Sequence, residues 1–505
     1  MATTSGGPDV LEESRPLIQP STSQAPVTIT IDPAYSRKSS SFVRQVFLGI
    51  IIALPSVPCG MSLGFSAVSF EQLRLDVDNA SWFASLTIMA FPIGSLIVGP
   101  LMDNYGRRPA LLSINVVSLI GWLMLAVPAE TPTIFKLLTG RVLTGIAGGL
   151  ASVPASVYAA ECLCSNNLAV RSALVSWSTV ALSGGICLVY TAGAMMDYYA
   201  VGSIATLISI VSLILVAVFI PESPVWLNMK GRYGDAEWSQ REINISPPPH
   251  PIEQPSEAED VGQPNIPPPP PHPETLKELL KPEAYKPLLI MIGFFFFQQF
   301  SGVYVIIAYM VDIVIASGEL LFNPFTITVI AGWIILLVSI IASLVYPSTG
   351  VRSVAALSGA GTTISMLFIG TFLNLRHYWI LDPNWYFMNW APVIAILANI
   401  AVSTVGFLIL PWSMLGEVFP LNVKGIAAGI ATCVGFTFSF IAIKIYPYIL
   451  LGLGASGVFF FFGAMALIGT IFVILFLPET KGKTLQEIVD GFAKRRTNQN
   501  QSSKN

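Results

Sequence analysis

The chain has 505 residues, of which 53% are hydrophobic and only 11% are charged, and its formal net charge is −3. Together with a mean hydropathy of +0.68, this composition lies far outside the range of water-soluble domains and predicts an integral membrane protein. We expect no nucleic-acid partner, because the only basic tract is the short run Lys494-Arg495-Arg496 near the C-terminus.

Residues 1–42 form a polar, serine-rich tail that we expect to be disordered and cytoplasmic. Glu13 stands four positions before the pair Leu17 and Ile18. This arrangement is typical of a dileucine sorting signal, which would bind adaptor proteins. A tail without function explains the same residues, because short patterns of this kind occur often by chance.

Apolar stretches of roughly 20 residues, each long enough to cross the lipid bilayer, recur along the chain. The first six lie at about 43–66, 81–102, 109–127, 133–157, 170–195 and 200–219, within a predicted N-terminal bundle of residues 43–221. The second six lie at about 285–314, 325–346, 353–373, 390–416, 423–448 and 455–477, within a predicted C-terminal bundle of residues 285–477. We predict helices, and so an all-α membrane protein, because backbone polar groups in lipid must be satisfied within each segment.

Two short motifs repeat at the end of each set of six stretches. Pro221-Glu222-Ser223 follows Glu161 at nearly the same spacing as Pro478-Glu479-Thr480 follows Glu417. An internal repeat of this kind points to a transporter built from two related bundles.

Between the bundles, residues 222–284 contain the proline runs 247–249 and 267–271. Such runs favour extended polyproline II structure and oppose a packed core. We predict a cytoplasmic linker with short helices at its ends, which serves as a plain spacer or, alternatively, as a ligand for an SH3-type domain. Residues 478–505 form the predicted cytoplasmic C-terminal tail.

Orientation follows from the positions of Arg and Lys, because cationic loops stay in the cytoplasm. The cations lie in alternate loops and at the termini, whereas the opposite loops hold Asp76, Asp78, Glu130 and Asp197. Both termini are therefore predicted to be cytoplasmic. Asn79-Ala80-Ser81 is an N-glycosylation sequon in the first outer loop, which makes Asn79 a candidate glycosylation site, although it lies close to the second span.

Several motifs carry a resemblance to a known family. Residues 99–108 (Gly-Pro-Leu-Met-Asp-Asn-Tyr-Gly-Arg-Arg) resemble the loop between helices 2 and 3 of the major facilitator superfamily. Further motifs resemble, in order, those of its sugar porter family, which includes glucose and trehalose facilitators: residues 140–145, 221–227, 298–302, 411–417 and 478–482. Residues 80–86 and 423–427 look most like the facilitated trehalose transporter branch found in insects. The resemblance covers about residues 43–490 and implies two pseudo-symmetric six-helix bundles that rock around a central site.

The resemblance also implies a sugar site near the middle of the membrane. Gln298 and Gln299 match the glutamines of helix 7 that bond sugar hydroxyls, and Trp412 matches the tryptophan of helix 10 that packs on the sugar. Amides suit this role because each both donates and accepts hydrogen bonds, as a hydroxyl does. Alternatively, the amides hold helices together, and Trp412 packs in a core or at the membrane interface.

Other positions depart from the family's sugar site. Tyr304 replaces the asparagine of helix 7, Thr179 aligns with the glutamine of helix 5, and Thr404 aligns with a glutamate of helix 10. Gly435-Phe436 aligns with the Asn-Trp pair of helix 11. These changes remove hydroxyl partners and weaken the case for glucose itself.

A set of charged residues, which we call the cytoplasmic latch, is implied to hold the cytoplasmic helix ends together in the outward-open state and to break on inward opening. Its members are Asp103, Arg107, Arg108, Arg141, Glu161, Arg171, Glu222, Glu417, Lys424, Glu479 and Lys481. Pro347 stands where the second half should repeat Asp103, so only half of that loop motif is kept. The alternative is a set of ordinary surface ion pairs, each worth about 0–1 kcal/mol.

The expected activity is facilitated diffusion of a hexose or trehalose by alternating access. Proton-coupled members carry an aspartate in helix 1, and the residue at the matching place is Ser66. We expect no enzyme activity, cofactor or metal. The alternatives are a sugar sensor that does not transport and a carrier of another small solute. The expected location is the plasma membrane, with endosomal or lysosomal membranes as the alternative.

Overall fold

The computed structural model describes residues 39–128, 134–162, 168–243, 279–317, 323–345, 349–379, 390–415, 418–420 and 423–479. Several predicted features lie outside the described residues: the sorting signal at Glu13, Leu17 and Ile18, the proline runs, Glu417, Lys481, and the side chains of Arg171 and Lys424.

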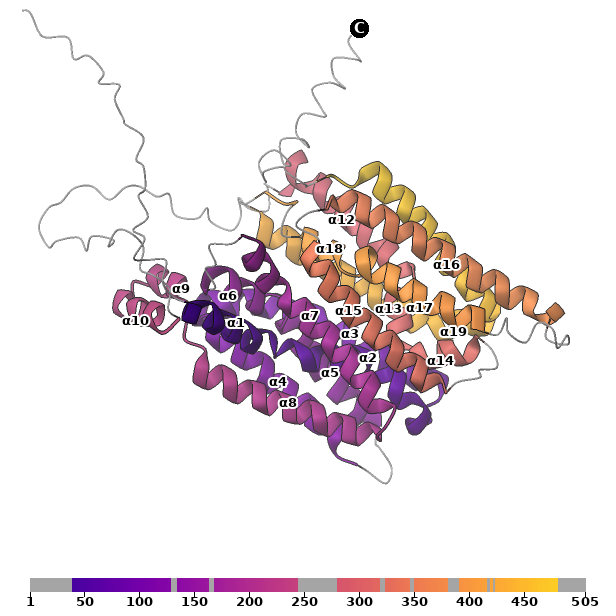
Figure 1. The fold of residues 1–505 in the computed structure, drawn as a ribbon, viewed down its shortest axis with the longest axis horizontal. Helices are drawn as coiled ribbons and strands as arrows, with labels where there is room; N and C mark the ends of the chain where they lie inside the picture. The colour runs from indigo at the N-terminus through magenta and orange to yellow at the C-terminus, as the bar shows by residue number, and fades with distance from the viewer. Residues whose placement is uncertain are drawn as a thin grey trace, which may run out of the picture. The chain divides into compact units, whose positions relative to one another are not determined.

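The N-terminal bundle contains six membrane spans. Its helices are α1 (Ser39–Ala53) with α2 (Ser56–Leu73), α3 (Val77–Tyr105), α4 (Arg107–Ala126), α5 (Ile134–Leu150) with α6 (Pro154–Cys162), α7 (Leu168–Gly193) and α8 (Tyr198–Phe219) (Figure 1). Two short helices, α9 (Pro224–Met229) and α10 (Tyr233–Ile243), occupy the first part of the segment predicted as a linker.

The C-terminal bundle contains more interrupted helices. Its seventh span is broken into α12 (Pro282–Phe300), α13 (Val303–Ala308) and α14 (Met310–Ala316), and is followed by α15 (Pro324–Val345) and α16 (Val351–Trp379). The tenth span consists of α17 (Ala391–Ser403), the π-helix η4 (Thr404–Leu408) and α18 (Leu410–Met414). The last helix among the described residues is α19 (Lys424–Phe476).

Helix lengths account for twelve spans. Nine stretches of the described residues are long and apolar enough to cross a membrane. One of them is α19, whose 53 residues would extend about 80 Å, far more than the roughly 30 Å of a hydrocarbon core. Gly454 divides it, because its φ of +70° lies in the region that glycine adopts without strain. The second half of α19, α7 and the broken seventh span complete the twelve.

Breaks inside spans occur where the chain offers helix-disrupting residues. Pro55 separates α1 from α2, and Gly302, with a φ of +87°, separates α12 from α13. Such breaks are tolerated in a membrane when neighbouring side chains satisfy the freed backbone groups. At both breaks the backbone N–H groups are satisfied by nearby carbonyls: that of Val57 donates to the Leu54 carbonyl oxygen, and that of Ser301 to the Phe297 carbonyl oxygen.

Small residues allow close packing within the N-terminal bundle. A Cβ atom added to Gly145 would lie 2.2 Å from the carbonyl oxygen of Thr87, and one added to Gly149 would lie 2.1 Å from that of Phe91. The face of α5 that carries these glycines therefore contacts the backbone of α3 directly. This is the usual basis of tight helix packing in lipid, where hydrophobic driving force between helices is absent.

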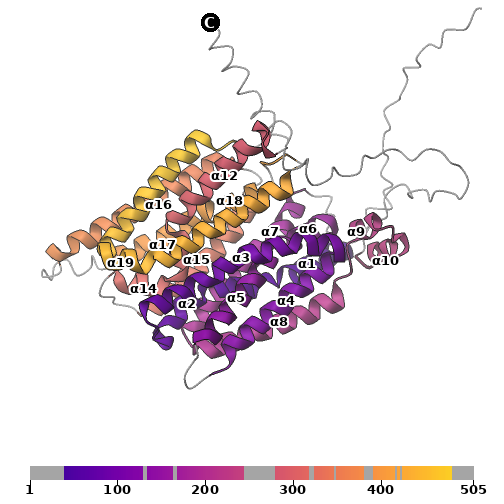
Figure 2. The ribbon, with the colours of Figure 1, turned by 180° about the vertical axis from the view of Figure 1, so that it is seen from behind.

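The two bundles lie side by side in both views (Figures 1 and 2). They meet along two helix pairs, α7 with α15 and α3 with α19. The hydroxyls of Ser183 and Ser339 lie 2.8 Å apart across the first pair. Because the two bundles touch along these pairs, side chains at their interface can form a site between them.

Candidate functional site

The Gln298 side chain forms hydrogen bonds with the backbone of the tenth span. Its Nε2 donates to the carbonyl oxygens of Phe407, at 2.6 Å, and Leu408, at 3.2 Å, both in the π-helix η4. Its Oε1 accepts from Nε2 of Gln299 at 3.3 Å. The side chain is fully buried. In this structure Gln298 thus joins helices, which is the alternative role considered for it above.

Gln299 retains hydrogen-bonding capacity. It is fully buried, and its Oε1 has no partner among the described residues. Gln299 lies one helical turn after Phe295, so the two side chains share a face of α12. A buried amide oxygen without a partner is energetically costly. The side chain is therefore suited to receive a hydroxyl from a bound solute.

Trp412 and Tyr304 form a direct pair. The indole Nε1 of Trp412 donates to the Tyr304 hydroxyl oxygen at 3.0 Å. The Trp412 ring packs between Phe295 and Phe436, with 4.7 Å between ring centroids in each case. Phe436 in turn lies 4.8 Å from Phe91 of the N-terminal bundle. We call Phe91, Phe295, Trp412 and Phe436 the central aromatic cluster, and it spans the bundle interface.

Tyr304 also lines a small cavity between the bundles, with Thr87 and Arg141 as the other polar residues of its wall. The remaining wall is apolar: Leu63, Ala84, Ile88, Ile307, Ala308 and Ile443. The cavity has room for about one water molecule. Thr179, predicted to bind substrate, is instead exposed on α7 and does not line this cavity.

Arg141 lies inside the N-terminal bundle, apart from the other members of the cytoplasmic latch. Its guanidinium donates to the carbonyl oxygens of Phe83, at 2.9 Å, and Ser62, at 2.6 Å. It also lies 5.0 Å from the centre of the Phe83 ring, a favourable cation–π distance. Within the described residues no carboxylate pairs with it.

Ser66, which the sequence places at the helix 1 position of the aspartate in proton-coupled members, contacts the other bundle. Its hydroxyl donates to the carbonyl oxygen of Ala308 at 3.1 Å. The helix 1 side chain beside Arg141 is Ser62, whose Oγ lies 3.2 Å from the guanidinium. The two serines are separated by one helical turn, and sequence alone does not decide which of them faces α5.

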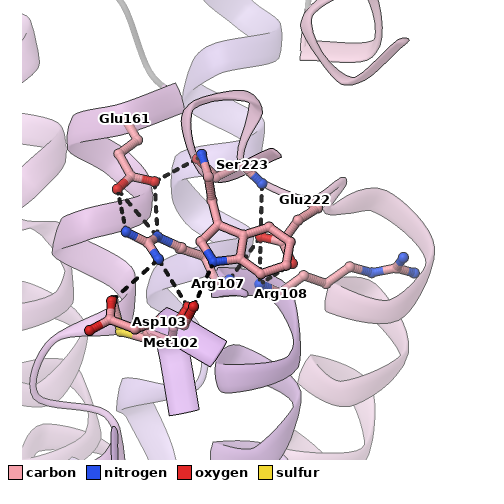
Figure 3. Close-up of polar contacts among 8 residues, drawn as sticks. Met102, Asp103, Arg107, Arg108, Glu161, Glu222 and Ser223 are labelled. Atoms are coloured by element: carbon pink, nitrogen blue, oxygen red, sulfur yellow. Dashed lines mark hydrogen bonds and ion pairs between the residues drawn. The ribbon is translucent and has the colours of Figure 1, made fainter. Parts of the chain in front are cut away.

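Arg107 is the centre of the cytoplasmic latch (Figure 3). Its guanidinium contacts both carboxylate oxygens of Glu161, at 2.9 to 3.2 Å, and donates to the Met102 carbonyl oxygen at 2.9 Å. Asp103 lies 3.8 Å away. The Ser223 hydroxyl donates to Glu161 at 2.5 Å. The exposed fraction of the side chain is 8% for Arg107 and 17% for Glu161, so this pair is largely removed from water.

Glu222 caps a helix, and within the described part of the chain it forms no ion pair with a cationic side chain. Its carboxylate accepts from the backbone N–H of Arg107, at 2.8 Å, and from that of Arg108, at 3.2 Å, at the N-terminus of α4. A carboxylate at this end of a helix satisfies free N–H groups and the positive end of the helix dipole. The Arg108 side chain extends away from the cluster (Figure 3) and donates to the Ala217 carbonyl oxygen at 2.6 Å.

The second bundle repeats this cap. Glu479 accepts from the backbone N–H of Val351, at 3.1 Å, at the N-terminus of α16. Glycines stand beside both carboxylates: a Cβ atom on Gly106 would meet Glu222 at 2.3 Å, and one on Gly350 would meet Glu479 at 2.8 Å. The Pro-Glu motifs at the two repeat ends therefore have the same structural role in both bundles.

Arg107 and Glu161 belong to the N-terminal bundle, and Glu222 directly follows its last span, α8. Separation of the two bundles alone would therefore not break their contacts. That they break on inward opening stays a prediction. Of the remaining latch residues, Arg171 lies on α7 and Lys424 begins α19, but their side chains, with Glu417 and Lys481, are outside the described residues.

Asn79, the candidate glycosylation site, lies in the first turn of α3. Its side-chain nitrogen, the atom that a glycan would modify, donates to the Asp76 carboxylate at 2.5 Å. Asp76 also caps the helix by accepting from the Asn79 backbone N–H. Modification of Asn79 therefore requires this helix end to open, and it stays a prediction.

A contact between the bundles at the outer end was not anticipated from the sequence. Lys444 of α19 donates to Asp78, at 3.1 Å, and to the Ser81 hydroxyl, at 2.7 Å, and it lies 4.1 Å from the centre of the Trp82 ring. The Tyr448 hydroxyl donates to Asp78 at 2.7 Å. We call these five residues the outer gate cluster. Its signal in the sequence is Lys444, a lysine near the outer end of the otherwise largely apolar stretch 423–448.

Further contacts close the same end. The Tyr190 hydroxyl donates to the Ile307 carbonyl oxygen at 2.7 Å. The Phe70 ring stacks on Tyr309 of the other bundle, with 5.4 Å between ring centroids. With the outer gate cluster, these contacts hold the bundles together at the outer end, which is closed in this structure.

Comparison with known proteins agrees with this architecture. Residues 43–492 match the family described as Sugar (and other) transporter. The chain is 28% identical over 471 residues to the facilitated trehalose transporter Tret1 of Apis mellifera ligustica, covering 90% of each, and 27% identical over 476 residues to that of Culex quinquefasciatus, covering 92% of this chain and 88% of the relative.

Solved structures with the same fold include the proton:xylose symporter XylE bound to 6-bromo-6-deoxy-D-glucose, with a TM-score of 0.66 and 19% identity, covering 90% of this chain and 100% of XylE. A partially occluded inward-open form of XylE from E. coli matches with a TM-score of 0.67 and 19% identity, covering 88% of this chain and 100% of that protein. The predicted all-α fold of twelve helices in two bundles is confirmed.

Proposed function

The chain belongs to the sugar porter family of the major facilitator superfamily, a family of multi-pass membrane transporters and not of enzymes, and on this premise we propose that it is a facilitative carrier of a hexose or trehalose. The observation that carries the proposal is the buried Gln299 oxygen, which has no partner among the described residues and lies on the same face of α12 as Phe295, whose ring packs against Trp412. An acceptor beside an aromatic face suits a sugar, which has both hydroxyls and apolar C–H surfaces. Relatives named as facilitated trehalose transporters support trehalose as one substrate to test.

Uniport is proposed because Ser66 stands at the helix 1 position where proton-coupled members of the family carry an aspartate. Its hydroxyl, which donates to the Ala308 carbonyl oxygen, does not take up a proton near neutral pH. A solute would then move down its own gradient as the two bundles alternate around the site. Transport that ignores a proton gradient is the expected consequence.

The test is uptake of labelled trehalose, glucose, fructose and a polyol into liposomes that contain the purified protein. Saturable uptake of one sugar, unchanged by a protonophore or by an imposed pH gradient, is the expected result. Concentrative uptake that a protonophore abolishes would contradict uniport while leaving sugar transport in place. Protein-free liposomes measure leakage.

A sugar sensor that does not transport is the second candidate, because the cavity beside Tyr304 has room for only about one water molecule. Binding of a sugar to folded protein without uptake of any sugar would favour it. A carrier of another small solute would show uptake outside the sugar panel.

We propose the plasma membrane as the location. The dileucine pattern at Glu13, Leu17 and Ile18 is proposed as an adaptor-binding signal that would retrieve the protein to endosomes. Replacing Leu17 and Ile18 by alanine should raise the surface fraction in cells if the signal is used. An unchanged distribution would leave an idle tail as the explanation.

A further inference from the structure

Tyr304 controls how many hydrogen-bonding groups the central site presents. Its hydroxyl oxygen accepts a hydrogen bond from the indole N–H of Trp412 at 3.0 Å. This donor is therefore not available to a solute. Gln298 is likewise engaged, through its amide nitrogen on the π-helix and its oxygen on Gln299. The Trp412 indole N–H and the Gln298 amide, which belong to residues predicted to bind sugar, therefore form hydrogen bonds within the protein instead.

Few polar groups remain. Gln299 has its unpaired oxygen, and the Tyr304 O–H has no acceptor among the described residues. Thr87 donates to the Arg141 carbonyl oxygen at 3.3 Å, and the Arg141 guanidinium is bonded to backbone carbonyls. A free hexose carries more hydroxyl groups than these, and each one that enters without a partner loses its hydrogen bonds to water.

Apolar rings form the rest of the site. In the central aromatic cluster, the rings of Phe295 and Phe436 both pack against the ring of Trp412. Gly435 makes this wall possible, because a Cβ atom at that position would lie 2.9 Å from Cδ1 of Phe295. A polar side chain at position 435 therefore could not enter the site without displacing Phe295. The wall stays aromatic because of a glycine on the neighbouring helix.

We propose that Tyr304 is the specificity-determining residue of the site and that it selects a sugar derivative in which an apolar group replaces part of the hydroxyl surface, over a free hexose. This inference rests on the proposed function as a sugar carrier. The sugar ring's remaining hydroxyls bond Gln299 and Tyr304, and the apolar group lies against the central aromatic cluster. Burial of an apolar group against aromatic rings favours binding without demanding further hydrogen bonds.

The experiment compares initial uptake of labelled glucose and of phenyl β-glucoside by full-length protein in liposomes. For the wild type we expect kcat/KM to favour phenyl β-glucoside at least about tenfold, equivalent to about 1.4 kcal/mol. Tyr304→Phe keeps the ring but removes the hydroxyl, which frees the Trp412 N–H for a solute hydroxyl. The preference should then fall roughly tenfold, mainly through better use of glucose.

Tyr304→Asn is the second variant, and it should reduce the preference in the same direction because it removes the phenol from the cavity wall. Tyr285→Phe, the same hydroxyl deletion on a half-exposed tyrosine at the start of α12, should leave the preference unchanged. Thermal unfolding of each variant checks its folding. If the Tyr304 variants do not fold, the proposal is judged on the wild type alone. Its uptake preference is then compared with the concentrations of glucose and of phenyl β-glucoside that raise its melting temperature.

Three results would overturn the proposal. If the wild type takes up glucose as well as or better than phenyl β-glucoside, the proposed selectivity is rejected, but sugar transport is not. An unchanged preference in folded Tyr304→Phe would remove Tyr304 as its cause. If no sugar is taken up and none raises the melting temperature, the proposed function and the inference are both rejected.

Discussion

At the scale of single residues, the pair formed by Arg107 and Glu161 determines how the cytoplasmic end of the N-terminal bundle is held. Both side chains are largely removed from water, so each is compensated mainly by the other. Loss of one partner leaves a desolvated charge, which costs far more than loss of an exposed pair.

The first prediction concerns this pair. Glu161→Gln should lower the free energy of unfolding by roughly 3 kcal/mol, because the Arg107 guanidinium remains buried without its carboxylate. Thermal unfolding in detergent measures the effect. Arg241→Ala is the matched control, since its pair with Glu237 has exposed fractions of 77% and 62% and should matter little. Equal effects of the two variants would show that the Arg107 pair is an ordinary surface contact.

A second prediction separates the two neighbouring glutamines. Gln298→Ala should lower stability by about 1–3 kcal/mol, because it strands the carbonyl oxygens that Gln298 satisfies in the π-helix. Gln299→Ala should lower uptake by roughly two- to tenfold, the worth of about one hydrogen bond to the solute. It should cost less stability than Gln298→Ala, because it removes the donor of one buried oxygen, Oε1 of Gln298, and leaves the π-helix carbonyls paired. Uptake and thermal unfolding are measured on both variants. The idea fails if Gln299→Ala transports normally.

At the scale of helices, contact between α5 and α3 depends on glycines whose missing side chains make room for backbone. Such positions cannot be exchanged for alanine by adjusting one flexible side chain, because the neighbouring atoms are carbonyl oxygens of a helix. The bundle therefore has little tolerance at these positions, although alanine is the better helix former.

A third prediction follows for this contact. Gly149→Ala should destabilise the protein by about 1–3 kcal/mol, as overpacking does, because its Cβ would lie 2.1 Å from the Phe91 carbonyl oxygen. Gly99→Ala has nothing within 4 Å of the added atom and should be neutral or slightly stabilising. Melting temperatures of the two variants test this, and a neutral Gly149→Ala would contradict the close packing.

At the scale of the whole molecule, the outer gate cluster biases the equilibrium between states. Asp78 is 65% exposed while the Lys444 side chain is only 17% exposed. The ion pair itself is therefore screened and worth little, and the contact of the ammonium with the Trp82 ring contributes more. A contribution near 1 kcal/mol is enough to change the population of a closed state about fivefold.

The fourth prediction is that Lys444→Met shifts the protein toward an open outer end. Spin labels on cysteines at Met196 and Leu453, exposed outer positions of the two bundles, should report a larger fraction of long distances. Lys136→Met is the control, because Lys136 donates to the Val127 carbonyl oxygen within its own bundle. A distance distribution identical to that of the unsubstituted protein would exclude Lys444 from the gate.

The sequence alone determined the all-α membrane class, the number of spans, the internal repeat and the family, because hydrophobicity and short motifs are local properties that need no knowledge of packing. It also indicated the residues of the cytoplasmic latch that Figure 3 brings together, Arg107, Glu161 and Glu222, although not that Glu222 acts as a helix cap. These residues belong to motifs whose spacing is visible along the chain.

Only the tertiary structure decided which polar side chains face the bundle interface. Gln298 donates to a carbonyl oxygen of the π-helix, and Trp412 donates to the Tyr304 hydroxyl. Arg141 donates to backbone carbonyl oxygens, and Lys444 pairs with Asp78. Each of these contacts joins residues of different helices, and the rotation of every helix about its axis is set by the packing of all its neighbours. A local pattern carries no information about that rotation.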